Sequence, residues 1–199
     1  CLSFLGIARE VAILESKEHE SLFAEVLANN SFDYIENDEL VNNNISVNIE
    51  DEKSCPLYLG KIVKGVEIKE SPKWLKEKLN SLGMKSINIV VDLANYVMLT
   101  FGQPMHTFDF NKLPTKKINV GYPLSKKALH TLDSVKRDLS DQNLLIKDND
   151  TPIAIAGVIG GKNTEVDSNT EDIFIESALF DPVVIRKSAK SADLSTDAS

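Results

Sequence analysis

The stretch from residue 86 to residue 110 combines an apolar helical pattern with an abrupt stop. Its apolar residues recur at helical spacing: Ile87, Val90, Val91, Ala94, Val97, Met98 and Phe101. Ser86 stands at an N-cap position, Gly102 stands where a helix ends, and Asp92 falls outside the apolar stripe. Several of these residues are β-branched and have low helix propensity, so packing must hold the helix. We therefore predict a helix with one buried face.

A segment that cannot continue the helix follows it and carries His106. Pro104 has no N–H group for a helical hydrogen bond, so we expect an ordered loop here. In such a loop, a ring nitrogen of His106 could meet a ligand or a second loop. A single loop histidine is more often structural than catalytic, and from the residues alone both interpretations stay open.

Shorter patterns of strands and helices surround this stretch. Alternating or continuous apolar residues predict strands at 45–49, 58–68, 118–122, 144–147, 152–159 and 173–175. A polar and basic stretch, 125–141, separates two of them. Helices are predicted at 2–14 and after Ser71-Pro72 and Asp181-Pro182, where an N-cap residue precedes proline. Strands outnumber helices in an irregular order, so we predict an α+β fold of layered mixed β-sheets with helices packed to one side.

The composition changes between residues 29 and 44, where Asn, Asp and Glu replace large apolar residues. This change predicts a linker. We expect residues 1–28 to be a helical segment that belongs to a preceding part, and residues 45–199 to form the main domain. Because the sequence starts at Cys1 and stops at Ser199 without a terminal cap, we also expect a piece of a longer polypeptide.

Composition and charge exclude several classes of protein. With 199 residues, of which 42% are hydrophobic, the chain can bury one sizeable core. A net charge of −8 argues against a protein that coats nucleic acid nonspecifically, because phosphate neutralisation needs clustered Lys and Arg. Two cysteines and three histidines without ligand spacing predict no metal site and no disulfide framework. This cysteine usage makes a reducing cytoplasm the expected location. No apolar run reaches bilayer length, so we expect no membrane partner.

Two further features suggest chemistry, and each has a structural alternative. The glycine-rich run 157–164 superficially resembles a phosphate loop, but its spacing differs, so we do not expect a nucleotide site; a turn that requires positive φ is the alternative. Glu176 ends an apolar strand pattern, where a carboxylate is costly unless it is paired or hydrogen-bonded. A structural capping role is the alternative for Glu176.

The string VVDLANYVMLTFGQPMHTFD, residues 90–109, closely resembles bacterial phenylalanyl-tRNA synthetase beta subunits. The similar region is the module that hydrolyses tyrosine wrongly attached to the phenylalanine tRNA. Other stretches resemble the same module in order: CLSFLGIARE, CPLYLGKIVKGV, SPKWLKEKLNSLGMKSIN, IAGVIGGKNTEV, IFIESALFDPVVIRKSAK and LSTDAS. The resemblance thus implies a tRNA-editing domain at 45–199, truncated at its C-terminal end.

The resemblance also implies roles for individual residues. His106 and Thr196 match catalytic positions, and Glu176 matches the glutamate that accepts the tyrosine para-hydroxyl. The other implied substrate-binding positions are Ala94, Asn95, Ala156, Gly157 and Ala198. Ala94 departs from the family, which usually has threonine there. If that hydroxyl only aids binding, activity should weaken; if it holds the attacking water, activity should be lost.

Further expectations concern the parent enzyme that the resemblance implies. It is an α2β2 heterotetramer with the phenylalanyl-tRNA synthetase alpha subunit, and it uses ATP and Mg²⁺ outside the region covered by this chain. The fragment itself is expected to need no cofactor, and to meet the acceptor end of the phenylalanine tRNA with tyrosine as the editing ligand. The rival hypothesis is a non-catalytic scaffold for subunit assembly with a degenerate pocket.

Overall fold

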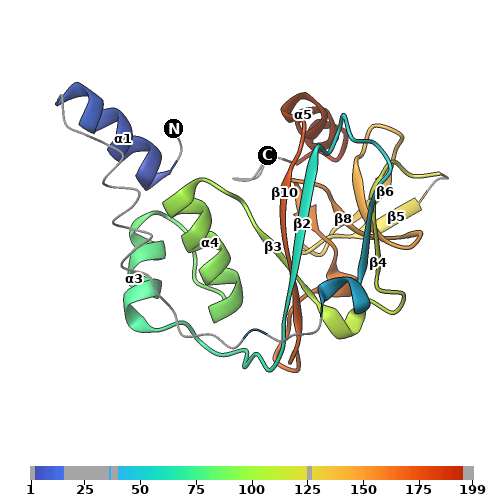
Figure 1. The fold of residues 1–199 in the computed structure, drawn as a ribbon, viewed down its shortest axis with the longest axis horizontal. Helices are drawn as coiled ribbons and strands as arrows, with labels where there is room; N and C mark the ends of the chain where they lie inside the picture. Colours follow the sequence, from blue (N-terminus) through green and yellow to red (C-terminus); the bar gives the residue numbers. More distant parts are fainter. Residues whose placement is uncertain (1–2, 16–35, 37–39, 125–126, 195–199) are drawn as a thin grey trace.

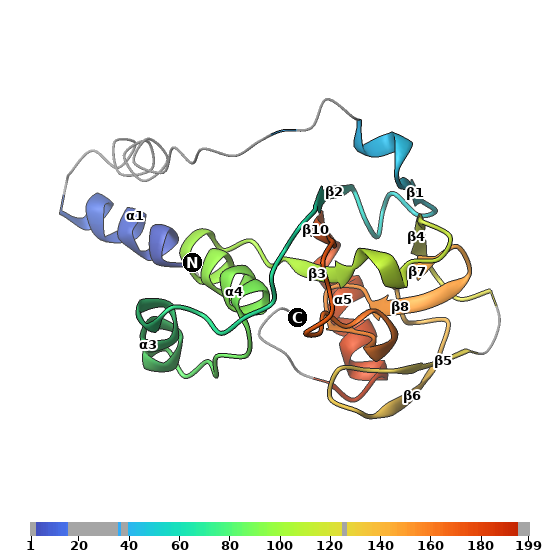
Figure 2. The same ribbon diagram turned by 90° about the horizontal axis from the view of Figure 1, so that it is seen from below.

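The computed structural model describes residues 3–15, 36, 40–124 and 127–194. Helices α1 (Phe4–Leu14), α3 (Lys73–Ser81) and α4 (Ile89–Phe101) lie to one side of the sheets in both views (Figure 1, Figure 2). Helix α5 (Pro182–Ser191) packs against the sheets themselves (Figure 1). The predicted α+β class is confirmed. None of the helices described is long and apolar enough to cross a lipid bilayer.

A five-stranded sheet holds much of the core. Its order is β1 (Ser46–Ile49), β4 (Lys117–Gly121), β7 (Leu145–Asp148), β8 (Thr151–Ile155) and β9 (Ile159–Gly160). β1 and β4 are parallel, and the other neighbouring strands are antiparallel. Its most deeply buried apolar side chains are Ile118, Val120, Leu145, Ile146, Ile153 and Ile155. The strands predicted at 45–49, 118–122 and 144–147 are therefore confirmed, each within one residue.

A three-stranded antiparallel sheet contains both His106 and Glu176. Its order is β2 (Leu57–Val63), β10 (Ile173–Leu179) and β3 (His106–Asp109). The rings of Phe108 and Phe174 stack across β3 and β10, with their centroids 6.2 Å apart. Gly60 in β2 pairs with Glu176, and a Cβ at Gly60 would lie 2.4 Å from the Phe174 ring. Only glycine lets β2 approach β10 at this point.

A hairpin of β5 (Lys127–His130) and β6 (Lys136–Leu139) occupies the stretch that we expected only to separate two strands. The charged residues concealed it, because only Leu129 and Leu139 face the core. Arg137 holds the turn through two 2.8 Å hydrogen bonds to the carboxylate of Asp133. Its Nε also donates to the carbonyl of Ala192, just after α5, at 3.1 Å. The hairpin is therefore tied to that helix.

Helix α4 ends as the sequence predicted, but it begins later. Gly102 adopts φ 83° at the C-cap. The N-cap is Asn88, whose side chain accepts hydrogen bonds from the amides of Val90 and Val91. The prediction of Ser86 as N-cap is wrong, because its hydroxyl donates to Asp92 instead.

The carboxylate of Asp92 is fully buried and joins three segments of the chain. It accepts hydrogen bonds from the hydroxyls of Ser71 and Ser86, both at 2.5 Å, and from the amide of Ile87 at 2.9 Å. Ser71 is therefore not the cap of α3, whose N-cap is Pro72. Asp92, which the apolar pattern placed outside the buried stripe, fixes the start of α3 against α4.

Helix α1 agrees with the helix expected at 2–14, with Ser3 as its N-cap, and it contacts α4. The rest of the expected helical segment 1–28, from residue 16, lies outside the described residues, as does most of the expected linker 29–44. A short 3₁₀ helix, Val41–Asn43, ends that linker range. Helix α5 begins at Asp181-Pro182 as predicted, because the Asp181 side chain accepts from the amides of Val183 and Val184.

We expect Asp92→Ala to lower the free energy of unfolding by about 3 kcal/mol, because three donors lose their buried acceptor. Urea denaturation followed by circular dichroism measures the change. Asp138→Ala is the control, since this aspartate is exposed and its loss should change stability by less than about 0.5 kcal/mol. Equal stability of the two variants would contradict a structural role for the Asp92 cluster.

Candidate functional site

A cavity of about 890 Å³ opens between the end of the three-stranded sheet, the β8–β9 turn and helix α5. The segment that follows α4, residues 102–105, forms another part of its wall. Much of the lining is apolar, with Ile146, Ile155 and Ile185 among the contributors. His106, Gly157 and Glu176 all line this cavity, although they come from three different elements. The structure therefore brings three of the predicted site residues together.

Glu176 lies in the middle of β10, between β2 and β3. It does not end the strand, as we had expected, because β10 continues to Leu179. The residue is only 5% exposed, and the hydroxyl of Tyr58 donates to its Oε2 at 3.1 Å. Burial raises the pKa of Glu176 to about 8, although the hydrogen bond from Tyr58 lowers it somewhat. Glu176 is thus largely a neutral carboxylic acid at pH 7.

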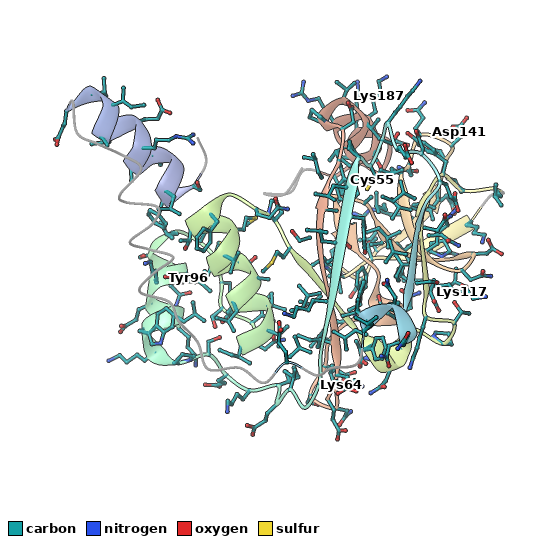
Figure 3. All side chains as sticks on the ribbon, viewed as in Figure 1. Cys55, Lys64, Tyr96, Lys117, Asp141 and Lys187 are labelled. Carbon is teal, nitrogen blue, oxygen red and sulfur yellow. The ribbon has the colours of Figure 1, made fainter. Side chains whose placement is uncertain are left out.

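Glu176 contributes to raised pKa values of two other buried groups, Tyr58 and Cys55. Tyr58 lies in β2 opposite Ala178. The pKa of Tyr58 is raised well above its usual value, chiefly by burial and secondly by the nearby carboxyl of Glu176. Burial also raises the pKa of the Cys55 thiol to about 11, and Glu176 adds to this effect. Cys55 is therefore a protonated, unreactive thiol at neutral pH. It lies beside β2 in the interior (Figure 3).

His106 is the first residue of β3, directly opposite Glu176 in β10. The prediction that it lies in a loop is wrong. The side chain of Gln103 donates to the carbonyl of Ala178 at 3.2 Å, which draws the segment after α4 alongside β10. The imidazole packs edge-on against Phe108, with ring centroids 4.5 Å apart. Burial lowers the pKa of His106 to about 4, so its imidazole is neutral at pH 7.

The glycine-rich run forms a tight hairpin and not one long strand. We had predicted a strand at 152–159, but the chain turns at residues 156–158 between β8 and β9. Gly157 in this turn has φ 65°, as expected if the glycine-rich run forms a turn that requires positive φ. A Cβ at Gly160 would lie 2.5 Å from Cε1 of His106, so the ring rests directly on the backbone of β9. Glycine at 160 is what leaves room for the imidazole.

The other predicted site residues lie elsewhere. Ala156 is fully buried in the core, and its amide donates to the carbonyl of Leu144. Ala94 and Asn95 are in α4 and are not among the residues that line the cavity. Thr196 and Ala198 lie outside the described residues.

Two residues that shape the site were not predicted from the sequence. Tyr58 donates a hydrogen bond to Glu176, and Gly160 contacts the ring of His106. The hydroxyl of Tyr58 had no visible partner, because Glu176 is 118 residues away in the chain. The alternation of side chains in β2 predicts that Tyr58 and Gly60 share one face, but not what they face.

The protonation states of Glu176 and His106 indicate which kind of ligand the cavity could bind. A neutral carboxylic acid and a neutral imidazole stand on adjacent strands at an apolar wall, so the cavity suits an uncharged or aromatic group that carries a hydroxyl. A protonated Glu176 can both donate to such a hydroxyl and accept from it. Within the part of the chain that the structure describes, no group of three His, Cys, Asp or Glu residues could hold a metal ion.

Comparisons with known proteins agree on one family. Residues 54–199 match the B3/4 domain. The chain is 40% identical over 199 residues to the phenylalanine–tRNA ligase beta subunit of Carboxydothermus hydrogenoformans, in a match that covers all of this chain but 24% of that protein. It is 42% identical over 200 residues to the corresponding subunit of Desulfotalea psychrophila, of which it covers 23%. The chain therefore spans about a quarter of the length of these relatives.

A solved N-terminal fragment of the phenylalanyl-tRNA synthetase beta subunit from Pyrococcus horikoshii also matches, with a TM-score of 0.48 and 16% identity. The match covers 82% of this chain and 51% of the fragment.

We expect the stability of the chain to fall relative to Glu176→Gln as the pH rises from 6.5 to 8. The pKa of Glu176 is about 8 in the folded state and near 4.5 when unfolded, so the folded state holds an extra proton in this range. The loss approaches about 1.4 kcal/mol per pH unit at its steepest. The lowered pKa of His106 acts in the opposite direction, but only below about pH 6.5.

Urea denaturation of both proteins at pH 6.5, 7.2 and 8 measures this difference. The glutamine side chain of the variant would keep an acceptor for Tyr58, so the comparison isolates the proton. Parallel stability curves would contradict a raised pKa for Glu176.

Proposed function

This chain belongs to the B3/4 domain family, and we propose that it is the part of a phenylalanine–tRNA ligase beta subunit that removes tyrosine wrongly attached to the phenylalanine tRNA. The observation that carries the proposal is the position of a buried, neutral Glu176 opposite His106 in one apolar cavity. The phenylalanine–tRNA ligase beta subunits that resemble the whole chain support the choice of parent enzyme.

Glu176 is suited to select tyrosine over phenylalanine. A site for phenylalanine cannot strongly reject a molecule that merely adds a hydroxyl, whereas a site with a buried polar partner for that hydroxyl rejects the molecule that lacks it. Tyr58 binds Oε2 of Glu176, and the described residues give Oε1 no hydrogen bond. Oε1 is therefore the atom that we assign to the para-hydroxyl of tyrosine.

His106 and the β8–β9 turn are suited to the hydrolytic step. An ester between an amino acid and tRNA is already labile, so the site chiefly has to position water and stabilise the developing oxyanion. The turn amides of Ala156 and Val158 donate to the carbonyls of Leu144 and Ile155, whereas the Gly157 amide has no backbone acceptor among the described residues. We assign the oxyanion to Gly157, and the orientation of water to the neutral imidazole of His106.

The proposal extends to the rest of the enzyme. Residues 45–199 form the editing domain, 29–44 the linker, and 1–28 the end of the preceding part. We also assign roles in the site to Thr196, Ala198 and Asn95, on the resemblance alone. The partners are the alpha subunit, in an α2β2 assembly in the cytoplasm, and the acceptor end of the phenylalanine tRNA. ATP and Mg²⁺ serve amino-acid activation in regions that this chain does not contain.

A non-catalytic scaffold is the second candidate, and Ala94 is the observation that favours it. Its side chain is buried in α4 and carries no hydroxyl with which to bind water. In that case the fold would assist assembly of the alpha and beta subunits while the cavity remained without activity.

We expect Glu176→Ala to reduce the preference for tyrosyl-tRNA over phenylalanyl-tRNA at least about tenfold, because the hydroxyl loses its buried partner. Deacylation of preformed tyrosyl-tRNA and phenylalanyl-tRNA by the full heterotetramer measures the preference. Glu171→Ala, which replaces an exposed glutamate just before β10, is the control and should leave it unchanged. Parental selectivity in Glu176→Ala would defeat the assignment of this residue.

The substitution Ala94→Thr separates the two candidates. If the unmodified heterotetramer already clears tyrosyl-tRNA, the added hydroxyl should raise the rate by no more than about tenfold, which is the worth of one neutral hydrogen bond. If the unmodified enzyme is inert and Ala94→Thr restores deacylation, the site has decayed on an intact scaffold. Inertness of both proteins would reject the editing proposal.

A further inference from the structure

Three cationic side chains form a ridge along the exposed side of α5, where this helix borders the cavity. Arg186, Lys187 and Lys190 are all exposed, and their spacing places them within one arc of the helix. The opposite side of α5 packs into the core through Ile185 and Ala189. We call these three residues the α5 ridge.

The ridge leads from the mouth of the cavity outward. Arg186 and Lys190 line the same cavity as Glu176 and His106. Lys187 and Lys190 line an adjoining shallow hollow, together with the side chains of Gln142 and Ser191. Lys190 therefore belongs to both depressions, and the basic surface is continuous between them. Figure 3 shows Lys187 on the outer side of α5, at the opposite end of the molecule from Lys64.

The charges of the ridge are not neutralised by the described part of the chain. No carboxylate forms an ion pair with Arg186, Lys187 or Lys190 among the residues described, whereas other cations near the core are paired. Examples are Lys147 with Glu50 and Arg137 with Asp133. Asp193 is the one carboxylate besides Glu176 that lines the cavity in this part of the structure. In a chain of net charge −8, a basic ridge that borders the cavity is a candidate surface for an anionic partner.

We propose that the α5 ridge binds the phosphates of the single-stranded 3′ end of the RNA whose terminal ester enters the cavity. This inference rests on the proposed function. When the terminal nucleotide sits at the cavity mouth, the phosphates that precede it must leave along the adjacent surface, one for each nucleotide. Arg and Lys neutralise such phosphates, and hydroxyl or amide groups like those of Ser191 and Gln142 add hydrogen bonds to the backbone.

The test uses the full heterotetramer that contains this beta chain. The triple variant R186Q/K187Q/K190Q is compared with the unmodified enzyme in deacylation of preformed tyrosyl-tRNA at 50 to 400 mM KCl. We expect the plot of log(kcat/KM) against log[KCl] to become shallower by about 2, since each single-strand phosphate contact contributes about 0.7 to the slope. For tyrosine ethyl ester, which has no phosphate, the slope against log[KCl] should not differ between the two enzymes.

The control is K64Q/K85Q/K117Q, which removes the same charge from exposed positions outside the cavity and should keep the parental slope. An unchanged slope in R186Q/K187Q/K190Q, with tyrosyl-tRNA still cleared by the unmodified enzyme, would overturn this inference and leave the editing function standing. Equal losses on tyrosyl-tRNA and on the ethyl ester would mean a structural role for the ridge. Loss of the α2β2 assembly in this variant would mean that the ridge binds an acidic surface of the partner subunit. Either result overturns the inference. An unmodified enzyme inert on tyrosyl-tRNA would reject the proposed function, and this inference with it.

Discussion

A buried carboxyl group in the central strand of the three-stranded sheet governs the architecture of this domain. Ionised Glu176 would be costly there, so the residue stays neutral and depends on the Tyr58 hydroxyl for a hydrogen bond. That bond requires β2 on one side of β10, and the opposition of His106 requires β3 on the other. The cavity wall thus exists only when both pairings form at their observed register.

Local chemistry made some elements predictable and left others hidden. The end of α4 at Gly102 and the start of α5 at Asp181 follow from backbone preferences of single residues, so the sequence predicted both. The N-cap of α4 did not follow, because Ser86 is taken by the buried carboxylate of Asp92. The β5–β6 hairpin was not predicted because its sequence is rich in charged residues. In the structure, the ion pair between Arg137 and Asp133 and the burial of one face stabilise it.

The candidate site shows the same division between local and remote information. Positive φ at Gly157 follows from the glycine-rich run, and the cost of a buried charge marks Glu176 as unusual. No local pattern places His106 opposite Glu176, since that depends on the register of two strands far apart in the chain. The roles proposed for both residues rest on resemblance to a family, and the geometry adds Tyr58 and Gly160 as their direct neighbours.

The wall of the cavity also has a consequence for how the domain folds. Tyr58 and Glu176 are separated by 118 residues, and His106 and Gly157 come from the intervening chain. Loop closure over such distances costs entropy and slows folding. The cavity is complete only once these remote segments have paired, so a partly folded chain has no binding site.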